Sequence, residues 1–200
     1  LPDVFGYSAA LPQILKKSGV DWFLTSKISW NECNQMPYDV FSWHGIDGTA
    51  INAYFLTAQE MGHTEDVTER YTTYVGFTRP QMIAGTWNRF QQKEYSDRVM
   101  VTFGYGDGGG GPTKQMLEQF RRLEKGLPGL PVAEMGFMTP HLEQRKQLFD
   151  AGCKRTQRTP KWVGELYLEF HRGTYTSIAK NKRNNRKSEL ILQKAEALSY

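Results

Sequence analysis

The sequence has few cysteines and no long apolar run. Its two cysteines, Cys33 and Cys153, are too few to form a structural zinc site alone, and so sparse a count is typical of a reducing compartment. We therefore expect a cytoplasmic protein. Every apolar stretch is interrupted within a few residues, whereas a membrane-spanning helix needs about 20 consecutive apolar residues. This excludes such a helix, and we expect no membrane partner.

Complete metal-binding and phosphate-binding motifs are also absent. No His-x-x-x-His or His-x-Asp pattern occurs. The glycines at 108–111 lead into Pro112, which has no N–H to offer a phosphate, and not into Gly-Lys-Ser/Thr. His44 and Asp47 have a spacing that could serve a metal, but a hydrogen-bonded pair in a glycine-bounded turn is favoured.

The net charge of +4 is unevenly distributed. Residues 151–190 hold ten Lys and Arg against three Glu, a local charge of +7, so the remainder carries −3. Five of these basic residues fall within 180–187, where no aromatic residues are interleaved. A solvated helix face is therefore favoured over phosphate contacts, and we expect no nucleic-acid partner.

With 39% hydrophobic residues and 5 Trp, 10 Tyr and 11 Phe, the chain can build a sizeable core. Apolar runs predict strands over 20–24, 40–43, 50–58 and 98–103. Helical spacing predicts helices over 8–19, 113–125 and 140–151, and a last one through Leu190 and Leu198. The stretch 57–79 is expected to be a loop with a helix in its second half. This alternation predicts an α/β fold with parallel strands and crossover helices, and a domain boundary between about 150 and 165.

Two carboxylates, Asp3 and Asp107, stand where a strand gives way to a helix. A turn or helix-capping role explains either one alone. At the carboxyl edge of one parallel sheet, however, they could face each other as the nucleophile and the general acid/base of a glycoside hydrolase. The aromatic residues near both suit sugar rings, although core packing explains most of them.

Five motifs resemble those of the glycoside hydrolase family 38 α-mannosidases, in particular the cytosolic, bacterial-type branch. They are LPDVFGYSA at 1–9, SKISWN at 26–31, FSWHGIDG at 41–48, GYGDGGGGP at 104–112 and ELYLEFHRGTYT at 165–176. The similarity runs over essentially the whole chain, in the order of the family.

The resemblance implies a retaining exo-α-mannosidase that removes terminal α-linked mannose from oligosaccharides or mannosides and depends on zinc or another divalent metal. It implies that residues 1–160 are the C-terminal part of a parallel β/α barrel-like catalytic domain. Residues 161–200 would start a helical middle domain, a three-helix bundle. Asp3 matches the catalytic nucleophile, which is also a metal ligand. Asp107 matches the loop of the general acid/base, and we expect an apolar, glycine-walled setting for it.

The resemblance also points to substrate-binding residues. They are Lys27, Trp30, Asp47, Tyr105, His171 and Tyr175. The other metal ligands of the family, a His-x-Asp pair upstream and a histidine downstream, do not occur in the sequence. We therefore expect an internal piece of a larger enzyme that binds zinc poorly and is inactive alone, and whose exposed apolar surface could lead to a homo-oligomer.

One alternative is a carbohydrate-binding or regulatory module without chemistry. Such a module would keep the aromatic and basic surfaces, but it would tolerate Asp3→Asn and Asp107→Asn. A nucleic-acid partner would rest on residues 180–187 alone, and steeply salt-dependent binding would reveal it.

Overall fold

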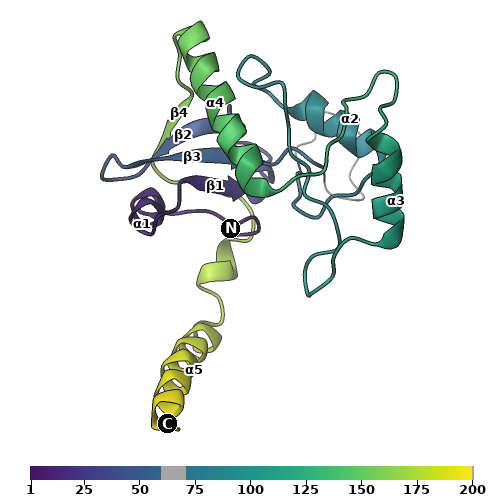
Figure 1. The fold of residues 1–200 in the computed structure, drawn as a ribbon. Coiled ribbons are helices and arrows are strands. Elements are labelled where there is room, and N and C mark those ends of the chain that lie inside the picture. Colours follow the sequence, from purple (N-terminus) through teal and green to yellow (C-terminus); the bar gives the residue numbers. More distant parts are fainter. Residues whose placement is uncertain (60–70, 200) are drawn as a thin grey trace. The chain divides into compact units, whose positions relative to one another are not determined.

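The computed structural model describes residues 1–59 and 71–199, and the chain divides into two compact units, Leu1–Phe170 and His171–Tyr200. The first unit contains a sheet with helices on both of its faces (Figure 1). Its strands are β1 (Trp22–Thr25), β2 (Val40–His44), β3 (Ala50–Phe55) and β4 (Lys161–Val163). Its helices are α1 (Leu11–Lys17), the short 3-10 helix η1 (Lys27–Ser29), α2 (Pro80–Arg89), α3 (Lys114–Leu123) and α4 (Met138–Thr156).

The four strands form one mixed sheet in the order β1-β3-β2-β4. β1 pairs in parallel with β3, and β2 in parallel with β4, but β2 and β3 are antiparallel. The predicted parallel pairing is therefore found in two of the three strand pairs, and the central pair is antiparallel. In the connecting turn the Gly45 N–H donates to the Thr49 carbonyl at 2.9 Å, and Gly48 has a φ of 83°. So short a turn can join only antiparallel strands, since a parallel connection needs about a dozen residues or more.

Alternating side chains of the central strands enter two hydrophobic clusters, one on each face of the sheet. Phe41 and Trp43 of β2 belong to one cluster, on which α1 packs. Val40 and its cross-strand neighbour Tyr54 belong to the other, together with Phe149 of α4. Both faces of the central strands therefore contribute to the core, although Ser42, His44 and Asn52 lie on the same face as Val40 and are only half-buried.

The predicted helices over 113–125 and 140–151 are confirmed, whereas the predicted strand over 98–103 is not. The helix predicted over 113–125 is α3, and the Thr113 side chain caps it by accepting from the Met116 N–H at 3.2 Å. α4 extends beyond the predicted 140–151 at both ends. The strand predicted over 98–103 is wrong: this segment forms only an isolated parallel bridge from Phe103 to Gly76.

The stretch 57–79 contains no helix in the part that the structure describes. Residues 60–70 lie outside the described residues, and the helix α2 begins only at Pro80. Proline favours this start because its fixed φ suits the first helical turn. The N–H groups of that turn have no acceptor within the helix, so the missing N–H of proline costs no hydrogen bond there. Neither a closed barrel nor a three-helix bundle is present in residues 1–59 and 71–199.

The second unit consists of the 3-10 helix η2 (Arg172–Tyr175) and the helix α5 (Ala179–Leu198). Its apolar side chains Ile191 and Leu192 are exposed. The unit starts later than residue 160, because β4 pairs with β2 and therefore belongs to the first unit. None of the helices within the described residues has the length and apolar character needed to cross a membrane.

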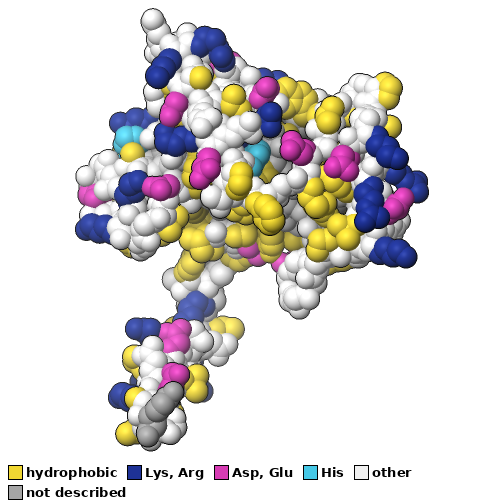
Figure 2. Space-filling model, viewed as in Figure 1, with side chains coloured by type: hydrophobic (Ala, Val, Ile, Leu, Met, Phe, Trp, Pro, Cys, Tyr) yellow, Lys and Arg dark blue, Asp and Glu magenta, His cyan; other side chains and the backbone are white. Residues whose placement is uncertain are grey.

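The surface of the first unit carries charges of both signs. On the face seen in Figure 2, Lys and Arg side chains are interspersed with Asp and Glu. Nucleic-acid surfaces typically gather basic residues on one face or along one helix. The absence of a nucleic-acid partner stays a prediction.

Candidate active site at the carboxyl end of β1

Asp3 lies beside the carboxyl end of β1. The Pro2 carbonyl accepts hydrogen bonds from the Ser26 N–H at 3.2 Å, the Ser26 hydroxyl at 3.2 Å and the Thr25 hydroxyl at 3.1 Å. The Tyr7 hydroxyl contacts Thr25 Oγ1 at 2.7 Å. These bonds hold the segment that carries Asp3 at the strand end, the edge where ligands bind in open α/β sheets.

Lys27, in η1, is the cation next to Asp3. Its Nζ lies 3.3 Å from Asp3 Oδ1, 3.5 Å from the centroid of the Trp30 ring and 5.9 Å from that of Phe5. The Lys27 side chain is 13% exposed and that of Asp3 is 43% exposed. A partly exposed ion pair adds little to the free energy of folding. Its main effect is to define where the two charges lie.

Asp107 lies in the loop 104–111, which folds back on itself. Gly104 has a φ of 118°, and a Cβ at this position would lie 2.8 Å from the backbone carbon of Gly111, so the loop requires glycine there. Asp107 itself has a φ of 55°, which is uncommon for a residue other than glycine. The loop is exposed from residue 105 to residue 110. The described residues therefore do not provide the enclosed apolar setting that was expected for Asp107.

Tyr74 is bonded to Asp107, and its pKa also responds to the charge of Asp3. Its hydroxyl donates a hydrogen bond to Asp107 Oδ1. This bond, then desolvation, and then the negative charge of Asp3 raise the pKa of Tyr74 well above its ordinary value. Tyr74 is therefore a hydrogen-bond donor throughout the physiological pH range, and both carboxylates act on its hydroxyl.

A short backbone pairing brings Tyr74 and the loop of Asp107 together. The Thr102 hydroxyl donates to the Tyr74 carbonyl at 2.7 Å, and the Gly76 N–H donates to the Thr102 carbonyl at 2.9 Å. The Gly104 N–H then donates to the Gly76 carbonyl at 3.0 Å. Because a Cβ at Gly76 would lie 2.5 Å from the Thr102 carbonyl oxygen, this close approach requires glycine.

Tyr74 was not identified from the sequence, because it lies in the polar stretch 57–79, where no motif or periodicity surrounds it. Thr72 of the same stretch was also missed. Its carbonyl accepts a hydrogen bond from Trp30 Nε1 at 2.8 Å, and its hydroxyl contacts Ser29 Oγ at 2.7 Å. This stretch therefore connects the two halves of the candidate site.

Three predicted substrate-binding residues, Lys27, Trp30 and Tyr105, lie in the segments that carry or contact the carboxylates. One face of the Trp30 ring meets Lys27, and Trp30 is edge-on to Tyr71 with centroids 5.5 Å apart. Tyr105 is edge-on to Phe77 at 5.6 Å and remains 52% exposed. Tyr105 is therefore the aromatic ring of this set with a large surface open to solvent.

Asp47 lies elsewhere, in the turn between β2 and β3 at the opposite end of the sheet from Asp3. It accepts hydrogen bonds from the Thr49 N–H at 3.0 Å, the Thr49 hydroxyl at 2.7 Å and Gln13 Nε2 at 2.6 Å. These hydrogen bonds, the one from the Thr49 hydroxyl above all, lower the pKa of Asp47. These contacts assign Asp47 to the turn, and its predicted contact with substrate has no support in this position.

His171 and Tyr175 belong to the second unit. His171 precedes η2 with a φ of 60°, and Tyr175 is the last residue of η2. Their predicted contact with substrate stays a prediction.

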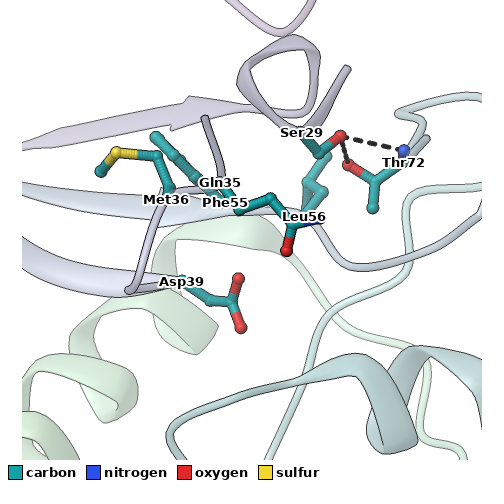
Figure 3. A pocket seen from close by; sticks show the side chains of 7 residues that line it. All are labelled: Ser29, Gln35, Met36, Asp39, Phe55, Leu56 and Thr72. Carbon is teal, nitrogen blue, oxygen red and sulfur yellow. Dashed lines mark hydrogen bonds between the residues drawn. The ribbon is translucent and has the colours of Figure 1, made fainter. Parts of the chain in front are cut away.

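A small pocket lies beside η1, with Ser29 and Thr72 on one side and Asp39 on another (Figure 3). It has room for about one water molecule. The buried Asp39 carboxylate accepts hydrogen bonds from the Gln91 N–H at 2.7 Å and from the Gln91 amide group at 3.2 Å. The pocket is therefore too small for a sugar ring, and its carboxylate supports the fold.

The described residues do not form a metal site. Among residues 1–59 and 71–199, no group of three or more His, Cys, Asp and Glu side chains could hold a metal ion. Zinc sites in proteins use three or four protein ligands. His44 contacts Ser42 Oγ at 3.0 Å and does not form the predicted pair with Asp47. Within the described part of the chain, Asp3 thus offers one ligand and not a site.

Several known proteins are similar to this chain. Residues 1–165 match the family described as glycosyl hydrolases family 38 N-terminal domain. Alpha-mannosidase 2C1 of Homo sapiens is 40% identical over 199 residues, which are 100% of this chain and 17% of that protein. Alpha-mannosidase of Saccharomyces cerevisiae is 38% identical over 203 residues, 98% of this chain and 17% of that protein. The chain thus spans less than a fifth of the length of these relatives.

A solved structure gives an independent comparison of the fold. The crystal structure of an alpha-mannosidase from Enterococcus faecalis V583 is similar with a TM-score of 0.50 and 12% identity, over 83% of this chain and 17% of that one. At this identity the likeness concerns the fold alone, and it agrees with the α/β class. The family match covers Asp3, Tyr74 and Asp107, and the chain accordingly belongs to glycosyl hydrolase family 38.

Proposed function

We propose that this chain is part of a retaining exo-α-mannosidase, which hydrolyses terminal α-linked mannose in oligosaccharides or mannosides. The observation that carries the proposal is the family match over residues 1–165, which includes Asp3 at the carboxyl end of β1 and Asp107 bonded to the Tyr74 hydroxyl. The charge of Asp3 also raises the pKa of Tyr74, which supports a position of the two carboxylates near each other. Retaining glycosidases place their two carboxyl groups about 5–5.5 Å apart.

In this proposal the two carboxylates act in two successive displacements. The Asp3 carboxylate attacks the anomeric carbon while Asp107 gives its proton to the departing glycosidic oxygen, which leaves a mannosyl ester on Asp3. Asp107, now ionised, then takes a proton from a water molecule that attacks the same carbon. Asp3 is released as a carboxylate, and mannose leaves with its original anomeric configuration.

The neighbouring side chains would hold the sugar. Lys27 can donate hydrogen bonds from its ammonium group beside Asp3. The exposed ring of Tyr105 offers an apolar face to the C–H groups of a sugar. The Trp30 ring packs against the Lys27 ammonium group, with its centroid 3.5 Å from the Lys27 Nζ.

Zinc or another divalent metal, and a cytoplasmic location, are further parts of the proposal. Asp3 would supply one metal ligand, and the other ligands would have to come from outside the described residues, because these form no metal site. A homo-oligomer also stays a hypothesis. When bound, such a metal would hold hydroxyl groups of the mannose next to Asp3, so turnover is expected to depend on it.

The test is hydrolysis of an aryl α-mannoside by the protein of natural length, before and after treatment with a chelator. We expect turnover that chelation abolishes and zinc restores, with the α-anomer of mannose as the first product in the proton NMR spectrum. Asp3→Asn should reduce kcat/KM by several orders of magnitude. Asp150→Asn is the matched control, since this exposed aspartate pairs with Lys146 along α4.

Two results would contradict the proposal. A β-anomer as first product would exclude the retaining mechanism. Absence of turnover on α-mannosides, combined with sugar binding that Asp3→Asn leaves intact, would favour the non-catalytic carbohydrate-binding or regulatory module.

A further inference from the structure

The side chain of Asp107 has few local restraints. Positions 108 and 109 have nothing within 4 Å of the place where a Cβ would lie, and the loop is exposed. A general acid, by contrast, must point its proton at the glycosidic oxygen within hydrogen-bond reach. The Tyr74 hydroxyl provides such a restraint, because it donates to one of the two carboxyl oxygens.

Tyr74 is itself well anchored. Its carbonyl accepts from the Thr102 hydroxyl at 2.7 Å, and the Thr73 N–H before it donates to the Ala58 carbonyl at 2.7 Å. Its ring also lies against the loop, since a Cβ at Gly106 would be 3.4 Å from Tyr74 Cε2. The hydroxyl therefore occupies a defined position, which a restraint on a mobile carboxyl group requires.

We propose that Tyr74 is a positioning residue that orients the carboxyl group of Asp107 for proton donation. The inference rests on the proposed function, in which Asp107 is the general acid. Because the Tyr74 hydroxyl occupies Oδ1, Oδ2 is the oxygen that carries the proton towards the leaving group.

The test compares two substrates that differ in their need for an acid. The leaving group of 2,4-dinitrophenyl α-mannoside departs without protonation, whereas that of methyl α-mannoside requires it. In the protein of natural length, Tyr74→Phe removes only the hydroxyl. We expect kcat/KM for the methyl mannoside to fall by about 10- to 100-fold, a part of the 10²–10⁴ that general acids contribute. For the dinitrophenyl mannoside we expect a change of less than about 3-fold.

The matched control is Tyr95→Phe. This variant removes a hydroxyl from a buried tyrosine that donates to the Arg158 carbonyl at 3.2 Å in the core. Any effect that it has through the fold should be equal for the two substrates. Should Tyr74→Phe fail to fold, Thr102→Val loosens the Tyr74 backbone and leaves its hydroxyl present, and we expect a smaller loss with the same preference for the methyl mannoside.

An equal loss for both substrates in Tyr74→Phe, or no loss for either, would overturn the positioning role. Failure of the proposed function gives a different result, because the unsubstituted protein would then hydrolyse neither mannoside.

Discussion

Two turns of the first unit each carry an aspartate beside glycines, and their surroundings differ. Asp47 accepts three hydrogen bonds from Thr49 and Gln13, so its own turn and the adjacent helix α1 satisfy it. Asp107 has a φ of 55° and takes its hydrogen bond from Tyr74, a residue of a distant segment. The two aspartates look alike in the sequence, but only one of them faces the rest of a site.

The difference teaches how to separate a structural carboxylate from a functional one. Two of the three hydrogen bonds of Asp47 return to its own turn, and the turn that they stabilise explains this carboxylate. Asp107 has an uncommon φ, which needs a further reason, and function is a frequent one. On this criterion Asp107 remains in the candidate site and Asp47 leaves it.

The sharpest test of this comparison substitutes each aspartate in the protein of natural length. We expect Asp107→Asn to lower kcat/KM for methyl α-mannoside by about 10²–10⁴-fold, since the amide cannot donate the proton of an acid. We expect Asp47→Asn to speed hydrogen exchange in peptides that cover β2 and β3, because one oxygen acceptor of the turn is lost. The comparison breaks if Asp107→Asn retains full turnover or if Asp47→Asn leaves this exchange unchanged.

Glu169 extends the comparison with a smaller expected effect. Its carboxylate accepts hydrogen bonds from the backbone N–H groups of Glu32 at 2.7 Å, Cys33 at 3.0 Å and Asn34 at 2.6 Å. These bonds, the Cys33 bond above all, lower the pKa of Glu169. Glu169→Gln would turn an amide N–H₂ towards these donors. We expect roughly several-fold faster hydrogen exchange in peptides that cover 26–34.

The control is Glu165→Gln, because Glu165 accepts from Trp162 Nε1 at 2.8 Å through its backbone carbonyl, which the substitution keeps. Equal exchange rates in the two variants would show that the Glu169 carboxylate does not hold this segment.

The smallest expected effect is that of acid pH, which distinguishes the half-buried His141 from the exposed aspartates. Burial, then the charges of Arg145 and Arg98, lower the pKa of His141 from 6.5 to about 4. Between these values the unfolded chain binds a proton that the folded chain does not, so stability should fall as the pH falls from 6.5 to about 4. Asp47, whose pKa is lowered from 3.8, loses its contribution only at still lower pH.

Hydrogen exchange of peptides from α4, measured at pH 7, 5.5 and 4.5 and corrected for the intrinsic exchange rate, tests this expectation. His141→Gln removes the titrating group and should flatten the pH dependence. An unchanged pH dependence in this variant would assign the effect to other groups.

Much of the fold was predictable where the signal is local. The apolar runs of β2 and β3, the spacing of Met116, Phe120 and Leu123 in α3, and its Thr113 cap are properties of neighbouring residues. Asp3 was selected by its position before a helix together with the family motif at 1–9. The strand over 98–103 failed for the opposite reason, because β-branched residues favour extended backbone but do not supply a partner strand.

The sequence by itself determined the α/β class, the membership in a family of glycosidases and the choice of Asp3 and Asp107, because periodicity and motifs are encoded within a few neighbouring residues. Only the tertiary structure decided the strand order with its antiparallel central pair, the hydrogen bonds of Asp47 to Thr49 and Gln13, and the bond from Tyr74 to Asp107. These features depend on contacts between distant segments, such as the pairing of Gly76 with Thr102. No local pattern specifies such contacts, because their free energy arises only when the whole unit has packed.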